Sequence, residues 1–368
     1  FDRFRVFAIF DEIHHCAGSN IDNANAWGEQ IIINIQDKAK LTLALTGTPW
    51  RSDAAPIVLS NYMHPSNKIS CDYIYGLAQA VRDNVCRLPQ IVAIDNDNIS
   101  VVDGIEKKTF SSFKSLLSQS NIPYQEVIQN EEVINYLIHS SHERLTEIRK
   151  TNSEAAGLIV ASSVEHAQAI LLLMKSCFNE NATLVTYRES EPIRIIQQFR
   201  DASTPWIISV GMISEGTNIP RLQVCCHLTN IKTEMHFRQI LGRILRRTNS
   251  ANQEAIMYMP AEPKLVEYAY RVKQDIPFEA DVVKFEKMKA RDEDAIKNKN
   301  VVSSIKPTTI TGKPKFALAG IDVVFDTKEI NNSDSIEECF LTTSYEKVVN
   351  IFGQFKQESI ALGLSELR

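Results

Sequence analysis

The chain has 368 residues, which is enough for two or three domains that each bury a core. Hydrophobic residues make up 44% and charged residues 23%, a balance that excludes a mainly disordered chain. The formal net charge of -5 excludes a general attraction to phosphate, so any nucleic-acid contact requires local basic patches.

Export and membrane insertion are not indicated by the sequence. No apolar run is long enough to span a bilayer, and the first residues lead into a strand-like run at Arg5–Phe10 without the pattern of a signal peptide. The seven cysteines lack the paired spacing of zinc ligands. We therefore expect a cytoplasmic protein with no membrane partner and no structural zinc.

The first part of the chain alternates short apolar runs with a helical pattern. Strands are predicted at Arg5–Phe10 and Leu41–Thr46, with a helix at Ala26–Gln36 between them. This rhythm is typical of a parallel sheet with crossover helices. From residue 65 to 150 the signal weakens, and we expect a connecting region that ends in a helix at Glu131–Arg149.

A second α/β rhythm follows and predicts a second parallel sheet. Beyond residue 262 the chain becomes charged, with a solvated helix predicted at Asp281–Lys299 and a strand at Phe316–Phe325. The expected domains are 1–64, 65–150, 151–262 and a mixed, mostly helical region at 263–368. The second rhythm predicts strands at Gly157–Ser162, Ala182–Thr186, Trp206–Val210, Leu222–Leu228 and Glu254–Met259, and helices at Val164–Cys177, Pro192–Arg200 and Glu234–Arg247.

Two adjacent carboxylates, Asp11 and Glu12, follow the first predicted strand. Open α/β sheets bind ligands at the carboxyl ends of their strands. In phosphoryl transfer one such carboxylate holds Mg²⁺ and a neighbour positions or deprotonates the attacking water, roles that suit Asp11 and Glu12 respectively. A solvated acidic turn is the alternative for the pair taken alone.

Three further segments fit the same chemistry, and each is weak alone. The turn Thr46-Gly47-Thr48 follows the next strand, and its glycine permits close backbone approach. The loop Gly211–Pro220 has the glycines and polar side chains of a phosphate-contacting segment, although an ordinary loop is the alternative. The third segment is a predicted helix on which Gln239, Arg243 and Arg246 share one face. The guanidinium groups on this face could reach the charge on a transferring phosphate, and a solvated basic face is the alternative.

Together and in this order, these segments resemble the motor of superfamily 2 helicases. Asp11-Glu12-Ile13-His14 is similar to the DExH motif, Thr46-Gly47-Thr48 to motif III, Gly211–Pro220 to motif V, and Gln239–Arg246 to the Q-x-x-G-R-x-x-R of motif VI. The resemblance covers residues 5–60 and 155–260 and is nearest to the type III restriction and excision-repair-like bacterial DNA helicases. It implies an α/β protein of two RecA-like domains, the first truncated at its N-terminus.

The resemblance also implies the roles of individual residues. ATP and Mg²⁺ are the expected cofactors, with Mg²⁺ on Asp11, and His14 is expected to couple hydrolysis to the second domain through Gln239 or motif III. The resemblance makes Arg243 and Arg246 arginine fingers. Nucleotide contact is expected at Gly216 and Asn218, and nucleic-acid contact at Thr46, Gly47, Thr48, Ser162, Gly211 and Thr217.

Two departures from the family pattern stand out. Asn218 occupies a position where many relatives carry Asp, which removes a charge but keeps hydrogen-bonding capacity. The phosphate-binding G-x-x-x-x-G-K-[ST] loop should precede Asp11 by many residues, yet only ten residues precede it here. We therefore expect a fragment or one half of a split protein, with little or no ATP turnover by these 368 residues alone.

The expected function is that of an ATP-dependent helicase or translocase motor acting on nucleic acid, with DNA favoured by the resemblance and ATP hydrolysed between the two lobes. One alternative is the motor subunit of a restriction or phage-defence complex, which requires a nuclease or methylase partner. The other alternative is a non-hydrolysing clamp or scaffold that binds nucleic acid without a phosphate loop.

Overall fold

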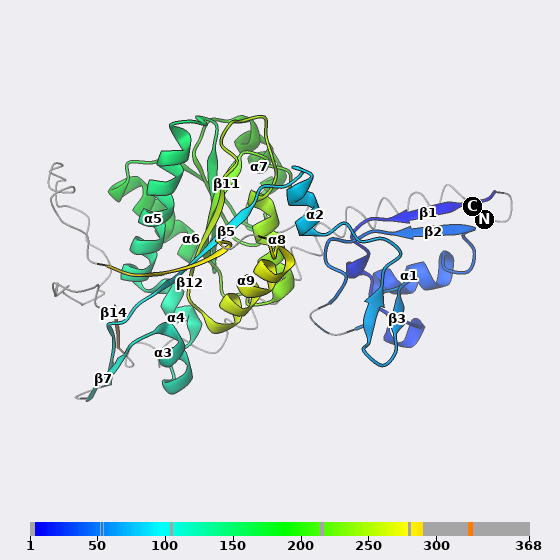
Figure 1. Cartoon of the computed structure of the whole chain (residues 1–368), viewed down its shortest axis with the longest axis horizontal. Coiled ribbons are helices and arrows are strands. Elements are labelled where there is room, and N and C mark those ends of the chain that lie inside the picture. The colour runs from blue at the N-terminus through cyan, green and yellow to red at the C-terminus, as the bar shows by residue number, and fades with distance from the viewer. Residues whose placement is uncertain are drawn as a thin grey trace. The chain divides into compact units, whose positions relative to one another are not determined.

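A computed structural model describes residues 4–51, 53, 55–103, 106–213, 217–278, 281–289 and 323–326. The chain divides into two compact units (Figure 1). The first contains Phe1–Gly76 together with Thr233–Arg238, and the second contains Leu77–Lys232 and the residues from Gln239 onward. Among the described residues, no helix has both the length and the apolar character that a membrane span requires.

The first unit is built on two short parallel strands that pair from Phe7↔Leu41 to Phe10↔Ala44. This pairing puts Phe7, Ile9, Leu41 and Leu43 on one face of the sheet, where all four are exposed. The elements are β1 (Phe7–Phe10), the 3₁₀ helices η1 (Ile13–His15) and η2 (Ile21–Asn23), α1 (Ala26–Asn34), β2 (Leu41–Ala44), and the antiparallel pair β3 (Asn61–Met63) and β4 (Lys68–Ser70).

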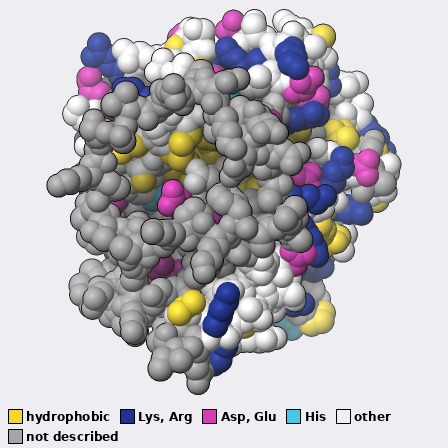
Figure 2. All heavy atoms as spheres, turned by 90° about the vertical axis from the view of Figure 1, so that its left-hand side faces the viewer, with side chains coloured by type: hydrophobic (Ala, Val, Ile, Leu, Met, Phe, Trp, Pro, Cys, Tyr) yellow, Lys and Arg dark blue, Asp and Glu magenta, His cyan; other side chains and the backbone are white. Residues whose placement is uncertain are grey.

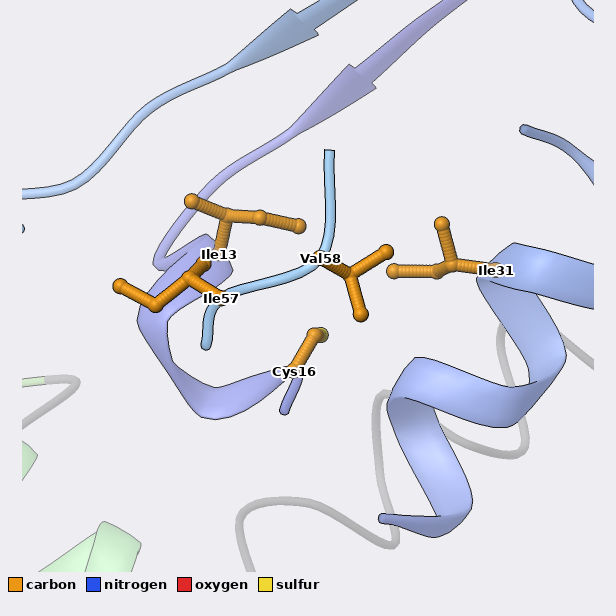
Figure 3. Close-up of a cluster of buried hydrophobic side chains, with 5 residues drawn as sticks. All are labelled: Ile13, Cys16, Ile31, Ile57 and Val58. Atoms are coloured by element: carbon orange, nitrogen blue, oxygen red, sulfur yellow. The ribbon is translucent and has the colours of Figure 1, made fainter. Parts of the chain in front are cut away.

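A small apolar cluster supports the turn that follows β1 (Figure 3). Ile13 and Cys16 from this turn pack with Ile31 of α1 and with the neighbouring pair Ile57 and Val58. All five side chains are buried. Because burial of apolar surface stabilises the folded chain, the cluster holds the backbone that carries the two acidic residues.

The second unit contains a seven-stranded sheet in which every neighbouring pair of strands is parallel. The protein is therefore of the α/β class, as the sequence predicts. Burial on both faces explains the continuous apolar runs of the central strands. In spatial order the strands are β13 (Val283–Lys287), β5 (Pro89–Asp95), β12 (Ala255–Pro260), β11 (Leu222–Leu228), β8 (Ala156–Ala161), β10 (Trp206–Ser209) and β9 (Ala182–Val185).

Helices pack against this sheet, and a smaller sheet accompanies it. Helix α5 packs on β11 and β12, whereas α6 packs on β9 and β10. The small sheet has the order β14-β6-β7. The helices are α2 (Leu77–Arg82), α3 (Phe113–Gln119), α4 (Tyr124–Gln129), α5 (Glu131–Arg149), α6 (Val164–Cys177), α7 (Pro192–Asp201), α8 (Glu234–Ile244) and α9 (Pro263–Asp275), and the small sheet contains β6 (Ile99–Asp103), β7 (Glu106–Phe110) and β14 (Val323–Asp326).

The structure corrects one predicted helix and adds several strands within the expected connecting region. Val283–Lys287, part of the helix predicted at Asp281–Lys299, forms β13 and pairs with β5. Its alternation of apolar and charged residues suits an edge strand better than a helix. Residues 290–299 lie outside the described residues, as do residues 316–322 of the other predicted strand. β5 joins the large sheet from within 65–150, and the four domain boundaries stay a prediction.

Charge on the second unit is mixed rather than uniformly basic. The face drawn in Figure 2 carries Lys and Arg side chains beside Asp and Glu side chains. Ion pairs of this kind join Arg188 to Glu165 at 2.8 Å and Lys287 to Asp97 at 2.8 Å. Specific recognition of phosphate must therefore depend on particular residues rather than on bulk charge.

Gly157 provides a test of packing between β8 and β10. A Cβ at this position would lie 2.2 Å from Cζ3 of the buried Trp206 ring. We expect Gly157→Ala to lower the free energy of unfolding by about 1–3 kcal/mol, because the well-packed core must shift. Gly242→Ala is the control, since a Cβ there meets nothing within 4 Å. Urea unfolding measures both, and equal stability of the two variants would contradict this account.

Candidate functional site

The turn after β1 presents the two carboxylates in an uncommon backbone conformation. Asp11 is exposed, and its Oδ1 accepts a hydrogen bond from the Glu12 amide at 3.0 Å. Glu12 adopts φ 53° and ψ 43°, in the left-handed region that favours glycine. Such strain persists where the surrounding structure enforces it, and it is found frequently at functional sites.

Main-chain hydrogen bonds fix this turn to the end of β2. The amide of Leu45 donates to the Phe10 carbonyl at 2.8 Å, and the amide of Ile13 donates to the Leu45 carbonyl at 3.0 Å. The parallel ladder thus continues past the last paired residues of both strands. As a result, the acidic turn and the Thr46-Gly47-Thr48 turn lie side by side.

His14 connects these two turns through a side-chain hydrogen bond. The ring is buried, and its Nδ1 lies 2.8 Å from Thr46 Oγ1 and 3.4 Å from Glu12 Oε2. Thr46 Oγ1 also accepts from the amide of Thr48 at 3.0 Å. Of the two couplings expected for His14, the one through motif III therefore has a direct contact, while the coupling role itself stays a prediction.

Arg51 completes this arrangement, although it is not among the residues that the sequence predicts. Its Nη1 donates to the His14 carbonyl at 2.6 Å, while Nε and Nη2 donate to the two carboxylate oxygens of Asp53 at 2.9 and 2.6 Å. The hydrogen bond from Arg51 is the main cause of a lowered pKa of Asp53. The only sequence signal was the position of Arg51, five residues after Thr46.

Asp11, the residue expected to hold Mg²⁺, suits a shared site rather than a cage made of protein ligands alone. Among the described residues, no group of three or more His, Cys, Asp or Glu side chains could hold a metal ion. Asp11 offers one exposed carboxylate. This fits Mg²⁺, which is often held by one or two carboxylates together with substrate phosphates and water.

The two predicted finger arginines meet motif V inside the second unit. Arg243 Nη1 and Arg246 Nη1 donate to the same carbonyl, that of Thr217, at 2.7 and 2.8 Å. Arg246 Nη1 also donates to Asn218 Oδ1 at 2.5 Å. Burial is the main cause of a lowered pKa of Arg246. Charge-assisted hydrogen bonds thus join motif V to motif VI, although the two motifs lie in different predicted elements.

The helix that carries these arginines is shorter than predicted. α8 ends at Ile244, so Gln239 and Arg243 lie on it but Arg246 does not. Arg246 instead forms an isolated antiparallel bridge with Cys86. The shared helical face expected for all three residues is therefore wrong for Arg246, because the chain leaves the helix to pair with the segment before β5.

The glycines expected at the site differ in what they do. Gly211 has φ 69°, a conformation that side chains rarely adopt, so glycine is required there. A Cβ on Gly47 would meet nothing within 4 Å. A close approach at Gly47 would therefore involve a molecule other than this unit. Gly216 lies outside the described residues.

A buried polar group follows β8 at the expected nucleic-acid position. Ser162 Oγ lies 2.8 Å from His166 Nδ1, and Ser163 caps α6 by accepting from the His166 amide at 3.1 Å. Ser162 is 1% exposed, so its hydroxyl faces the protein rather than solvent. Burial lowers the pKa of His166 from 6.5 to about 4.

Residues 132–248 match the family described as the helicase conserved C-terminal domain. This segment includes the strands β8, β10 and β11 and both predicted finger arginines. The second unit therefore contains a helicase conserved C-terminal domain. The family match is confined to residues 132–248, and several strands of the large parallel sheet lie within it.

Two mycobacterial relatives extend the similarity beyond this domain. An uncharacterized protein of Mycobacterium leprae (strain TN) is 30% identical over 271 residues, which are 72% of this chain and 44% of that protein. An uncharacterized protein of Mycobacterium tuberculosis (strain ATCC 25618 / H37Rv) is 29% identical over 271 residues with the same coverage. This chain therefore spans less than half the length of these relatives.

Solved structures with similarity to this chain include two restriction enzymes. A fragment of a putative HsdR subunit of a type I restriction enzyme from Vibrio vulnificus YJ016 is 14% identical, with 67% of this chain and 44% of that chain covered and a TM-score of 0.47. The type ISP restriction-modification enzyme LlaBIII bound to DNA is 13% identical, with 77% and 21% covered and a TM-score of 0.47.

The conformation of Glu12 leads to a stability prediction. Glu12→Gly should raise the free energy of unfolding by up to about 1 kcal/mol, because glycine adopts the left-handed region without a Cβ penalty. Glu12→Gln is the matched control and should leave stability unchanged. Urea unfolding compares the two, and equal stability of E12G and E12Q would show that the turn is not strained.

His166 leads to a pH prediction. The pKa of His166 is about 4 in the folded chain against 6.5 ordinarily, so between these values the unfolded chain binds a proton that the folded chain does not. The contribution of His166 to the free energy of unfolding is therefore fully present above about pH 6.5 and is lost as pH falls toward 4. This contribution is on the order of 3 kcal/mol at most. Urea unfolding at about pH 7.5 and about pH 5 measures the loss.

The matched variants for this prediction are His166→Gln and His139→Gln. His139 is partly exposed and pairs with Glu143 at 2.9 Å on α5. His166→Gln should remove the part of the pH dependence that His166 causes and leave that of His142, whose pKa is also lowered by burial, whereas His139→Gln should retain both. The same pH dependence in both variants would contradict a buried, neutral His166.

Proposed function

We propose that this chain forms part of an ATP-dependent superfamily 2 motor that moves on nucleic acid, with DNA as its substrate. The observation that carries the proposal is that hydrogen bonds connect the candidate motifs within each unit. His14 bonds to Thr46 in the first unit, and Arg243 and Arg246 bond to Thr217 in the second. Residues singled out by chemistry and by resemblance thus form physical networks.

ATP and Mg²⁺ are the proposed cofactors. Asp11 would hold Mg²⁺, whose positive charge offsets the charge that develops on the transferring phosphate. Glu12 would orient and deprotonate the attacking water, and its place beside His14 would let hydrolysis affect Thr46. Arg243 and Arg246 would stabilise negative charge on a bound nucleotide.

Asn218 affects how the arginines would serve this role. Its amide oxygen accepts from Arg246, so the side chain holds the guanidinium without a full ionic attraction. An aspartate at this position would pair with Arg246 more strongly. The amide therefore leaves Arg246 more easily available to phosphate, which is consistent with nucleotide contact at Gly216 and Asn218.

Nucleic-acid contact is proposed at the turns after β2, β8 and β10, where the resemblance places it. Thr46, Gly47 and Thr48 form the first of these turns, and the open space at Gly47 would allow a sugar-phosphate backbone to approach. At the second turn, buried Ser162 would shape the loop rather than bind through its hydroxyl. The third contact is proposed at Gly211 and Thr217.

The proposal of a restriction or phage-defence motor adds a partner to the same chemistry. Such a complex would include a nuclease or methylase subunit. Purification of the complete protein at native expression levels would test this directly, because a stoichiometric nuclease or methylase would identify the complex. Purification without either subunit would favour an independent helicase or translocase.

Two substitutions in the complete protein test the motor. Glu12→Gln should retain ATP binding but lose turnover, because the carboxylate that activates water is gone. Arg243→Ala should lower kcat by about 10³-fold or more if the guanidinium stabilises transition-state charge. Nucleic-acid-stimulated phosphate release measures turnover, and equilibrium titration with a fluorescent ATP analogue measures binding.

Arg194→Ala is the control for these variants. Arg194 is exposed on α7 and pairs with Glu191 at 2.9 Å, away from the motifs. It should hydrolyse ATP at the wild-type rate. Normal hydrolysis by E12Q or R243A would remove that residue from its role, and nucleic-acid binding without any hydrolysis by the wild-type protein would identify a clamp instead.

A further inference from the structure

Arg87 is a buried guanidinium in the segment that leads into β5, outside all the predicted motifs. It is 1% exposed. Burial, with a smaller effect from Arg247, lowers the pKa of Arg87 to about 10. Taking a charge out of water costs free energy unless hydrogen bonds compensate. The hydrogen-bond partners of Arg87 therefore show which segments the buried guanidinium connects.

The acceptors around Arg87 are neutral oxygens from three separate segments. Nη1 donates to the carbonyls of Leu222 at 2.6 Å and Ile244 at 3.0 Å, and Nη2 donates to the Pro220 carbonyl at 3.1 Å. Nε donates to Gln253 Oε1 at 3.2 Å. A planar guanidinium with donors in fixed directions can satisfy all of these acceptors together, whereas a lysine ammonium cannot.

Two of these acceptors lie within the candidate motifs V and VI. Pro220 is the last residue of the motif V segment, and Ile244 is the last residue of α8, which carries Arg243. Arg87 therefore ties the end of motif V to the end of the helix that carries most of motif VI. Arg243 and Arg246 tie the same two motifs together through the Thr217 carbonyl.

The backbone around Arg87 reinforces this connection. The Arg87 amide donates to the Leu245 carbonyl at 2.7 Å, and Cys86 forms the isolated bridge with Arg246. Asn84 Oδ1 accepts from Arg247 Nη1 at 3.1 Å. Residues 84–87, which we term the brace, thus run alongside the chain that leaves α8 and hold it at successive positions.

We propose that Arg87 is a positioning residue that fixes Arg243 and Arg246 relative to motif V for hydrolysis. The inference rests on the proposed ATPase function and adds a residue that touches neither nucleotide nor nucleic acid. Without the guanidinium, Pro220 and Ile244 lose their common donor. The finger arginines then keep their charge but lose their fixed direction, and misplacement of a catalytic group by about 1 Å can cost on the order of 100-fold in rate.

The chain offers a matched control in Arg221. It is also buried, at 8% exposed, and burial also lowers its pKa to about 10. Its guanidinium donates to the carbonyls of Phe199 and Thr204 at 2.7 and 2.8 Å, before β10 rather than between the motifs. Arg221→Lys therefore reproduces the loss of a buried guanidinium whose hydrogen bonds, within the described part of the chain, reach neither motif VI nor residues 84–87, although Arg221 itself follows Pro220 in the chain.

The experiment compares Arg87→Lys and Arg221→Lys in the complete protein, with each variant corrected for its folded fraction. Arg87→Lys should lower kcat for ATP by about 10-fold to 100-fold with KM changed little, because binding survives while the fingers are misplaced. Arg221→Lys should lower thermal stability and keep kcat within about twofold of wild type. Equal kcat in the two variants would overturn the positioning role.

Hydrogen–deuterium exchange separates this inference from the proposed function. Arg87→Lys should raise exchange in peptides covering 217–222 and 241–248 together, whereas Arg221→Lys should raise it near 199–206 and around Arg221 itself but leave 241–248 unchanged. If the wild-type protein does not hydrolyse ATP, the proposed function fails and the exchange pattern alone decides whether the brace exists. Exchange at 241–248 that matches in both variants would overturn the brace itself.

Discussion

Parallel pairing is the constraint on which both units depend. In a parallel sheet every strand runs in the same direction, so all carboxyl ends meet at one edge and the connections must return along a face. The turn after β1 and the turn after β2 are neighbours for this reason, and hydrogen bonds between Phe10, Ile13 and Leu45 extend the pairing into them. This strand pairing therefore sets the positions of the polar residues in the two turns.

Buried polar groups then fix what the sheet places only approximately. His14 pairs with Thr46 in the first unit, and Ser162 with His166 in the second. Arg87 and Arg221 are each surrounded by carbonyl oxygens. Because an unpaired buried donor costs free energy, each of these groups selects one arrangement of the loops around it. The candidate motifs are therefore held by specific hydrogen bonds where they meet within each unit.

Much of the fold could be predicted from local patterns. The helices at Glu131–Arg149 and Val164–Cys177 and the strand at Leu222–Leu228 have the predicted bounds, because their apolar periodicity is strong and their ends carry capping or turn residues. β5 and β13 were not predicted, since a short apolar run or an edge strand gains its identity from the strands beside it. α8 ended early because Arg246 pairs with Cys86 across a long sequence separation.

The sequence by itself determined the α/β class, the order of the motifs and the residue types that suit phosphoryl transfer, because these depend on periodicity and on side-chain chemistry. Tertiary structure alone decided which of those residues touch. No local sequence signal indicates the left-handed backbone of Glu12. The same is true of the hydrogen bond from Arg51 to His14 and of the carbonyl that accepts from both Arg243 and Arg246. Such contacts depend on how distant segments pack, and a one-dimensional pattern does not encode that packing in a readable form.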